Sequence, residues 1–179
     1  MRYNVAQLLK GHVGETRHYS LQEPIDDLDA AIKPLSDLNG AVELIRTNDG
    51  ILVRANLRTN VELTCSRCLV EFSYPARFEI DEEFHPTIDI LTGARLPKPE
   101  NADVATLIDE HHILDLSEMV RQNLTLEIPM VPVCRNNCQG LCPVCGKNRN
   151  QEQCSHETET LDPRFAILKN LLDESEQNN

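Results

Sequence analysis

Aromatic residues are scarce in this chain: they make up 4% of its 179 residues, and tryptophan is absent. Hydrophobic residues still make up 40% of the chain, so we expect a core built mainly from leucine, isoleucine and valine. Long apolar runs are missing too, and none approaches the roughly 18 residues of a membrane-spanning helix. Residues 1–15 have neither the apolar stretch of a signal peptide nor the composition of a transit peptide. We therefore expect a cytoplasmic protein that has no membrane partner.

Positive charge is also in short supply. Lysine and arginine number 17 against 29 aspartates and glutamates, which gives a net charge of −12. This balance argues against nucleic-acid binding over the whole surface. Most of the excess lies in residues 81–130, where three basic and eleven acidic side chains give −8. The cysteine-bearing parts of the chain are neutral, so the sequence allows a local RNA-contacting face there.

Motifs of several enzyme classes are missing from the sequence. It contains no P-loop, no dinucleotide-binding fingerprint and no nucleophile elbow. The acidic pairs at 82–83 and 109–110 are better explained as solvated charge than as catalytic carboxylates, and the histidines at 111–112 as an exposed surface pair. We therefore expect a protein that is not an enzyme and has no small-molecule substrate.

Alternation of apolar and polar residues predicts a long β-hairpin. The alternation runs from Val53 to Leu63 and resumes from Val70 to Ile80, as in two strands that share one buried face. An Asn-Asp-Gly turn at 48–50 joins the hairpin to an earlier strand near residues 41–47, which gives a three-stranded antiparallel meander. Proline 75, on the polar face, favours an edge position. Residues 2–22 are expected to add a strand or two.

Helix signals follow the predicted sheet. Residues 86–112 have no clear period and three prolines, which indicates an acidic surface loop. Asp115 and Glu118 resemble a capping box for a helix near 115–127, with leucines, Met119 and Val120 on its apolar face. An Asp-Pro pair at 162–163 is typical of the start of a last helix.

These elements predict an α+β fold, in which an antiparallel β-sheet with a long hairpin packs with two or more helices and carries a zinc-binding segment. We expect three parts. Residues 1–130 form a mainly β domain with the acidic loop 86–112 and the helix near 115–127. Residues 131–160 form the zinc-binding segment, and residues 161–179 form a C-terminal helix with a frayed tail.

The seven cysteines are the strongest chemical signal in the sequence. Their odd number argues against a complete disulfide framework, and cytosolic thiols stay reduced. Cys65 and Cys68 form a C-x2-C pair at the tip of the hairpin, which is the geometry of half a tetrahedral metal site. A second cluster consists of Cys134, Cys138, Cys142, Cys145, Cys154 and His156. Eight ligands would complete two four-coordinate zinc sites.

Two partitions of these ligands are compatible with the spacing. The first places Cys142, Cys145, Cys154 and His156 on one zinc ion and Cys65, Cys68, Cys134 and Cys138 on another. The rival pairs the two C-x2-C motifs, Cys65 and Cys68 with Cys142 and Cys145. Either gives closed, structural sites rather than catalytic ones. An iron–sulfur cluster, a redox-active Cys-Ser-Arg-Cys motif, and spare reduced cysteines, Cys134 above all, are the less favoured alternatives.

The glycine after Cys145 fits a zinc knuckle. In the sequence Cys-Pro-Val-Cys-Gly, glycine permits a positive backbone φ after the second cysteine. Backbone amides in such a turn can donate to the sulfurs and orient them. The Cys142–Cys145 pair is therefore the ligand pair that the sequence predicts most strongly.

A few cations are available for contact with phosphate. Arg54 and Arg58 share the polar face of one strand, and Arg67 lies at the hairpin tip. Arg135, Lys147 and Arg149 belong to the cysteine segment. Most such arginines only make a sheet soluble, but these six are the candidate RNA-binding residues, because phosphate contacts supply most of the affinity for RNA.

The order of these motifs resembles the YceD family, the large ribosomal RNA subunit accumulation proteins of bacteria and plastids. The resemblance is carried by Ile113-Leu-Asp-Leu116, Leu126-Glu-Ile-Pro129, Cys134-x3-Cys138-Gln-Gly-Leu-Cys142-Pro-Val-Cys145-Gly-Lys-Asn148, Cys154, and Asp162-Pro163-Arg164-Phe165-Ala-Ile-Leu168. It implies a factor for accumulation or processing of large-subunit ribosomal RNA and for ribosome assembly. Its implied partners are the precursor RNA or assembly proteins. The alternatives are a protein-interaction adaptor without RNA contact and, more distantly, a C-x-x-C thiol oxidoreductase.

Overall fold

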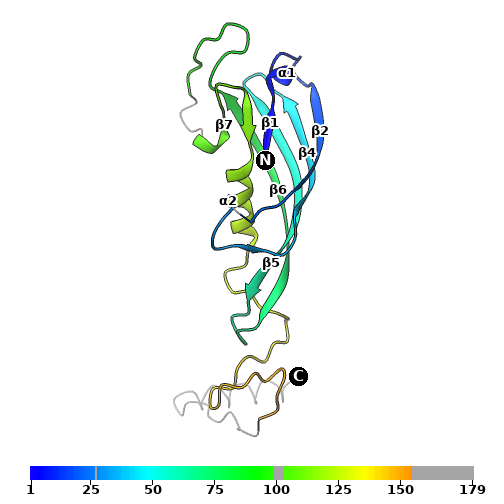
Figure 1. The fold of residues 1–179 in the computed structure, drawn as a ribbon, viewed down its shortest axis with the longest axis vertical. Helices are drawn as coiled ribbons and strands as arrows, with labels where there is room; N and C mark the ends of the chain where they lie inside the picture. The colour runs from blue at the N-terminus through cyan, green and yellow to red at the C-terminus, as the bar shows by residue number, and fades with distance from the viewer. Residues whose placement is uncertain (27, 99–102, 155–179) are drawn as a thin grey trace, which may run out of the picture. The chain divides into compact units, whose positions relative to one another are not determined.

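The computed structural model describes residues 1–26, 28–98 and 103–154 (Figure 1). The chain divides into two compact units. The first, here called the sheet unit, contains Met1–Ser66 and Val70–Cys134. The second, the cysteine unit, contains Arg67–Leu69 and the described residues from Arg135 onward. The helix and tail expected over 161–179 lie outside the described residues.

The sheet unit holds all the helices and strands that the structure describes (Figure 1). In chain order they are β1 (Arg2–Asn4), α1 (Ala6–Leu9), β2 (Thr16–Glu23), β3 (Lys33–Pro34), β4 (Leu38–Arg46), β5 (Ile51–Thr64), β6 (Glu71–Pro86), the 3-10 helix η1 (Val104–Thr106), β7 (Leu107–Ile108), β8 (Ile113–Asp115) and α2 (Ser117–Glu127). The main sheet has the strand order β2-β4-β5-β6-β7, and β3 also pairs with β5. Its pairs are antiparallel except β6 with β7, so the sheet is mixed. Strands β1 and β8 form a separate antiparallel pair.

The long hairpin predicted from the alternation is formed by β5 and β6, which pair along 14 residues from Ile51 opposite Phe84 to Thr64 opposite Glu71. Every second side chain of β5 from Ile51 to Val61 is buried, because successive residues of a strand point to opposite faces. The preceding strand, β4, starts three residues before the predicted position, at the fully buried Leu38. Pro75 lies on the outer edge of β6, as predicted, since β6 pairs with β7 only at its last two residues.

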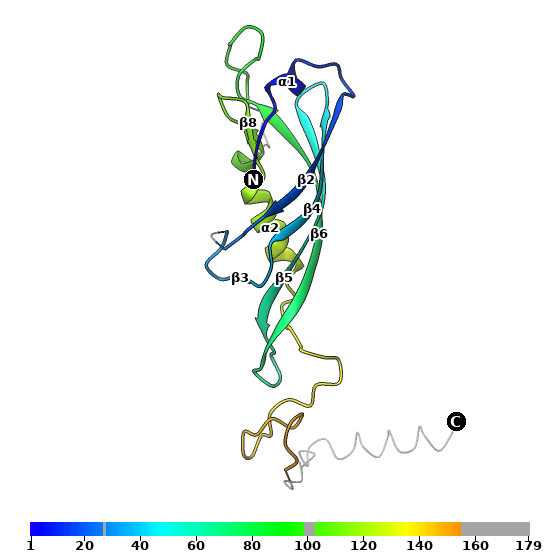
Figure 2. The same ribbon diagram turned by 45° about the vertical axis from the view of Figure 1, so that its right-hand side comes forward.

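The core lies between one face of the sheet and α2. Met119, Val120 and Leu124 of α2 are buried, together with Leu116 just before it. Figure 2 shows α2 against this face, while the opposite face of the main sheet has no described element over it. As expected from the composition, leucine, isoleucine and valine dominate the core, and Phe84 is its largest fully buried side chain.

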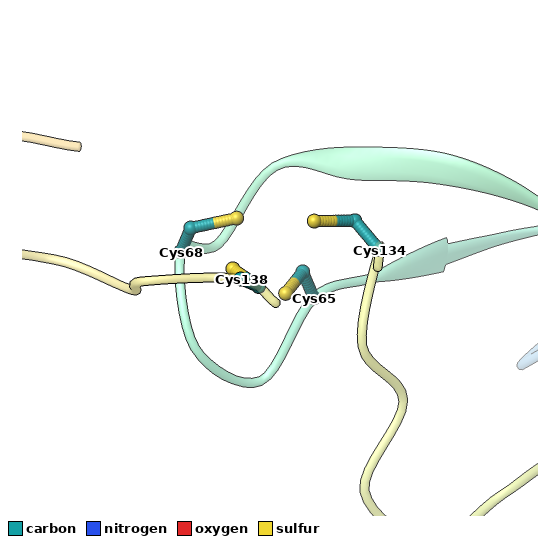
Figure 3. A group of neighbouring side chains, drawn as sticks. All are labelled: Cys65, Cys68, Cys134 and Cys138. Carbon is teal, nitrogen blue, oxygen red and sulfur yellow. The ribbon is translucent and has the colours of Figure 1, made fainter. Parts of the chain in front are cut away.

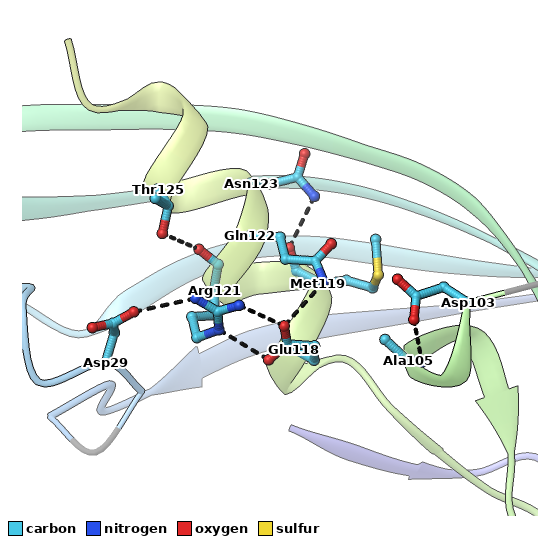
Figure 4. A network of polar contacts seen from close by, with 9 residues as sticks. All are labelled: Asp29, Asp103, Ala105, Glu118, Met119, Arg121, Gln122, Asn123 and Thr125. Carbon is cyan, nitrogen blue, oxygen red and sulfur yellow. Dashed lines mark hydrogen bonds and ion pairs between the residues drawn. The ribbon is translucent and has the colours of Figure 1, made fainter. Parts of the chain in front are cut away.

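The start of α2 differs from the predicted capping box. A carboxylate oxygen of Asp115 does accept a hydrogen bond from the backbone N–H of Ser117, at 2.9 Å. Glu118, however, accepts from the guanidinium of Arg121 at 2.6 and 2.9 Å and from Gln122, instead of turning back to the helix start (Figure 4). A charge-assisted pair with an arginine one turn along the helix is the stronger interaction. The Arg121 guanidinium, with help from Gln122, lowers the pKa of Glu118 to about 2.

The described residues of the stretch 86–112 contain more regular structure than the predicted irregular loop. Strand β7 pairs in parallel with the end of β6, with His85 opposite Leu107 and Pro86 opposite Ile108. Ile108 is fully buried, and its carbonyl oxygen accepts hydrogen bonds from the backbone and hydroxyl of Thr87. The short, two-residue strand leaves no period that sequence reasoning could detect. No helix in the described part of the chain is long and apolar enough to cross a bilayer.

Candidate metal centres

The first cysteine group brings together Cys65, Cys68, Cys134 and Cys138. Their four sulfur atoms all lie within 4.8 Å of one another. Figure 3 shows the four side chains pointing inward, two of them from the loop between β5 and β6 and two from the segment that follows α2. Cys65, Cys68 and Cys138 are buried, and Cys134 is half-buried. Residues far apart in the sequence therefore form one compact set of thiols.

This set fits a tetrahedral metal ion. Four thiolates about 2.3 Å from one zinc ion lie about 3.8 Å from one another, within the observed limit of 4.8 Å. All four donors are sulfur, which suits zinc or an iron–sulfur cluster far better than magnesium or calcium. With four protein ligands the coordination is complete, as in structural rather than catalytic sites.

The loop between β5 and β6 places the first two ligands. The backbone N–H of Cys65 donates to the carbonyl of Val70 at 2.9 Å, which closes the hairpin. Leu69 has a φ of 57°, an uncommon value for a leucine, and this turns the chain back into β6. The N–H of Ser66 donates to the carbonyl of Pro132 at 2.8 Å, which holds the hairpin beside the chain that leads to Cys134.

Arg67, one of the candidate RNA-binding residues, has a structural role within the cysteine unit. Its guanidinium donates to the carbonyl of Cys138 at 3.1 Å and to that of Asn136 at 3.4 Å. Its own carbonyl accepts from the N–H of Leu141 at 3.0 Å. Gly140 has a φ of +72°, and a Cβ there would lie 3.0 Å from the Arg67 carbonyl oxygen. Both the backbone conformation and the space therefore require glycine at position 140.

The second cysteine group consists of Cys142, Cys145 and Cys154, whose sulfurs also lie within 4.8 Å of one another. Gly146 has the positive φ predicted for it, +71°. Its N–H donates to the carbonyl of Cys142, and the N–H of Cys142 donates to the carbonyl of Lys147, both at 2.8 Å. The result is a tight turn that presents two thiols on one side.

The turn also favours the thiolate of Cys142. Backbone N–H groups of Cys145 and Val144 donate to its sulfur and, with contributions from neighbouring thiols, lower the pKa of Cys142 to about 6. Hydrogen bonds to a charged form stabilise that form, and the thiolate is the form that binds metal. This is the amide-to-sulfur bonding expected for a zinc knuckle.

The observed grouping follows the first of the two partitions. The Cys65–Cys68 pair lies with Cys134 and Cys138, and the Cys142–Cys145 pair lies with Cys154. The structure does not bring the two C-x2-C pairs into one group of the described residues. His156, the predicted fourth ligand of the second group, lies outside the described residues. Three thiols of this group are therefore in place for a metal ion that prefers four ligands.

Asn150 links the chain around Cys138 to the turn that follows the second cysteine group. The sequence did not indicate this role. Its side-chain amide donates to the sulfur of Cys138 at 3.3 Å and to the side-chain oxygen of Asn148 at 2.8 Å. Its own oxygen accepts from the N–H of Gln139 at 2.9 Å. An outer hydrogen bond of this kind orients a ligand and tunes its charge. The sequence feature that could have indicated this role is the pair Asn148 and Asn150, which follows closely after Cys145.

The other candidate RNA-binding cations fall into two classes. Arg54 lies 3.6 Å from a carboxylate oxygen of Asp81, and Lys147 lies 2.6 Å from Glu152. The side chains of Arg58, Arg135 and Arg149 are exposed and make no hydrogen bond or ion pair with the residues that the structure describes. The positive charges of Arg58, Arg135 and Arg149 are therefore available to a ligand.

Comparison with known proteins identifies relatives of this chain. A family model described as large ribosomal RNA subunit accumulation protein YceD matches residues 53–172. An uncharacterized protein of Mycobacterium tuberculosis is 32% identical over 138 residues, which cover 77% of this chain and 62% of that protein. The large ribosomal RNA subunit accumulation protein YCED homolog 1, chloroplastic, of Arabidopsis thaliana is 33% identical over 158 residues, covering 76% of this chain and 49% of that protein.

The uncharacterized protein YlbN of Bacillus subtilis is 32% identical over 120 residues, covering 64% of this chain and 62% of that protein. The chain therefore spans about half to three fifths of the length of these curated relatives. No solved structure matches it. The region matched by the family model contains β5 from Val53 onward, β6, α2 and every cysteine of the chain.

Proposed function

Because the chain belongs to the YceD family of large ribosomal RNA subunit accumulation proteins, we propose that it promotes accumulation of large-subunit ribosomal RNA by binding the precursor RNA during ribosome assembly. The observation that carries this proposal is the family match over residues 53–172, which includes both arms of the hairpin and all the cysteines. The protein acts by binding and not as an enzyme. It works in the cytoplasm, where its thiols stay reduced.

Zinc is the proposed cofactor. The first group, Cys65, Cys68, Cys134 and Cys138, forms a closed four-thiolate site. The second group, Cys142, Cys145 and Cys154, is completed by His156. Both ions serve to shape the chain around them, and an iron–sulfur cluster is the less favoured occupant.

RNA contact runs through the neutral parts of the protein. Residues 81–112 carry much of the excess negative charge and repel phosphate by roughly 1 kcal/mol per close exposed pair in water. The proposed cations are Arg54, Arg58, Arg67, Arg135, Lys147 and Arg149. The exposed side chains of Arg58, Arg135 and Arg149, with no described acidic partner, are the best placed of these. Arg67 acts chiefly by shaping the cysteine unit, through its bonds to backbone carbonyls.

Crosslinking in living cells tests the proposal. Ultraviolet irradiation followed by stringent purification of the protein should recover precursor large-subunit RNA, and depletion of the protein should lower the level of mature large-subunit RNA. If depletion has this effect but no RNA is crosslinked, the protein is instead an adaptor that recruits an assembly protein. Fast alkylation of Cys65 and Cys68 in the metal-loaded protein would favour the third alternative, a thiol oxidoreductase, because closed metal sites protect their thiolates.

A further inference from the structure

The face of the main sheet opposite α2 has no described element over it (Figure 2), and most of its outward-facing residues are polar. Its side chains come from alternate residues of β2, β4, β5 and β6, and those of β5 from Arg54 to Asn60 are exposed. No phenylalanine, tyrosine or tryptophan occurs at the outward-facing positions of these four strands. Nucleic-acid bases are usually bound on sheets by stacking on such rings. This face therefore lacks the large aromatic rings of the usual base-stacking platform.

Charges on this face alternate in sign across the strands at one level. Arg54 of β5 lies opposite Glu43 of β4 on one side and Asp81 of β6 on the other, with 3.6 Å between the charged groups of Arg54 and Asp81. Opposite charges on directly paired residues stabilise a sheet. At this level the charge of Arg54 is matched within the protein.

Four residues further along β5, the pattern breaks. Arg58 lies directly opposite Arg77 in the register of β5 and β6. Both side chains are exposed, and neither makes a hydrogen bond or an ion pair with any residue that the structure describes. Like charges directly opposite each other destabilise a sheet. The fold thus places two arginines at directly paired positions, at a cost that a bound anion would remove.

The surroundings of the two arginines can accept a ligand. Both arginines line two shallow hollows, one of about 440 Å³ shared with Asn56 and Glu79 and one of about 160 Å³ shared with Asn39 and Asn60. The side-chain amides of Asn39 and Asn60 already donate one hydrogen bond each, to the Asp37 carbonyl and the Ser36 hydroxyl. Each amide has a second N–H, and Asn56 has two, that an anion could accept from. Among the described residues that line the two hollows, Glu79 is the one carboxylate, beside two arginines.

We propose that Arg58 and Arg77 together bind a phosphate of the backbone of single-stranded RNA, and that this outer sheet face reads the backbone and not the bases. The proposal rests on the proposed function and assigns it a site. Guanidinium groups bind phosphate through paired N–H···O bonds, and two of them can bind one phosphate or two neighbouring ones. Because the face has no phenylalanine, tyrosine or tryptophan ring for stacking, we expect binding here to depend little on sequence.

The decisive measurement is binding of the full-length, metal-loaded protein to a fluorescent single-stranded RNA of mixed sequence over a range of salt concentrations. The variant Arg58→Gln/Arg77→Gln should bind about tenfold or more weakly, because each arginine contributes a charged hydrogen bond. The magnitude of its salt slope should fall by about 0.7 where the two arginines share one phosphate and by about 1.4 where they bind two neighbouring ones. Thermal unfolding should show equal or greater stability, because a like-charged pair has been removed.

The matched control is Lys33→Gln/Glu62→Gln, which removes an ion pair between β3 and the same strand β5 without changing net charge. It should leave both the affinity and the salt slope within about twofold of the unmodified protein, because Lys33 is already neutralised by Glu62 and is not among the proposed RNA-binding cations. A second variant, Arg77→Glu, places an acid opposite Arg58. It should abolish the contribution of this site to binding while raising the melting temperature, which a merely structural role for Arg77 does not predict.

Three outcomes would overturn the proposal. If the Arg58→Gln/Arg77→Gln variant binds RNA as well as the unmodified protein does, RNA binding stands and this site is wrong. If an oligonucleotide with uncharged methylphosphonate linkages binds equally well, the face does not read phosphate. If the unmodified protein binds no RNA while an acidic peptide competes for the arginines, the site serves a protein partner, and the RNA-binding function fails with it.

Discussion

The sheet unit and the cysteine unit of this protein are each stabilised by a different kind of interaction. The sheet unit has a continuous core in which Phe84, Leu38, Leu44 and many other apolar side chains are fully buried. Between residues 135 and 154, by contrast, the buried residues are Cys138, Gly140 and Cys142. This segment has too little apolar surface to offset the conformational entropy of folding by burial alone. Ligation of a metal by its cysteines can supply the missing free energy.

Metal removal should give the largest change in stability, and it should affect the cysteine unit while leaving the sheet unit folded. We expect one or two zinc ions per chain by native mass spectrometry. In the variant Cys142→Ser/Cys145→Ser, hydrogen exchange between residues 134 and 160 should become fast, while β5 and β6 stay protected. Binding of a structural zinc ion is worth about 10–16 kcal/mol in small zinc domains, so its loss unfolds the segment that depends on it.

The control for metal removal is Val144→Ser, a change at an exposed position between the same two cysteines. It should keep both the metal and the slow exchange. Global unfolding of Cys142→Ser/Cys145→Ser at ordinary temperature, or a stably folded protein without any metal in reducing buffer, would contradict this difference between the two units.

A substitution in the core of the sheet unit should lower the stability of that unit without releasing metal. Phe84→Ala removes the largest fully buried side chain of the sheet unit and should lower its free energy of unfolding by about 3–5 kcal/mol. Below the unfolding temperature, the metal content should not change. Denaturant titration followed by circular dichroism measures the first effect and mass spectrometry the second. Leu126→Ala, at a side chain that is 82% exposed, is the control and should change the free energy of unfolding little.

Two glycines sharpen the comparison within the cysteine unit. Gly140→Ala and Gly146→Ala each place a Cβ on a backbone with φ near +70°, which costs roughly 1–2 kcal/mol. Only at Gly140 would the new Cβ also press on the carbonyl oxygen of Arg67. Chelator competition should therefore release metal from Gly140→Ala more readily than from Gly146→Ala. If both variants release metal equally readily, the close approach of position 140 to the Arg67 carbonyl oxygen has no role in holding the metal.

The smallest expected effect concerns pH and the start of α2 (Figure 4). The pKa of Glu118 is lowered to about 2 by Arg121, so the ionised form contributes to folding at a pH above its ordinary value of 4.5. That contribution should be lost as the pH falls from about 5 toward 2. The stability difference between the unmodified protein and Glu118→Gln should therefore shrink over this range. Both side chains are partly exposed, so the difference is small even at neutral pH.

This pH prediction is best measured as the difference between Glu118→Gln and the unmodified protein at each pH, because acid also protonates the thiolates of both cysteine groups and releases metal from the two proteins alike. Arg121→Gln should remove the same pH dependence, since it takes away the partner of Glu118. A stability difference that grows as the pH falls would have the wrong sign and would reject the assignment.

Local patterns were enough to predict several features of this protein. The period-two alternation after Val53 depends only on neighbouring residues, because side chains of a strand alternate between faces. It correctly indicated the buried and exposed faces of β5 and β6. The positive φ of Gly146 likewise follows from the geometry of a Cys-x-x-Cys-Gly turn. The family could also be recognised, because its motifs occur in a fixed order along the chain.

Contacts between distant residues could be decided only by the tertiary structure. Spacing along the chain could not choose between two partitions of the cysteines, since either one closes loops of similar length. The choice depends on how the chain after α2 meets the hairpin loop, which brings Cys134 and Cys138 to Cys65 and Cys68. The parallel pairing of β7 and the opposition of Arg58 and Arg77 have the same origin. A shift of one residue in strand register would move every side chain of a strand to the other face, and no local pattern records which arginine will lie opposite which.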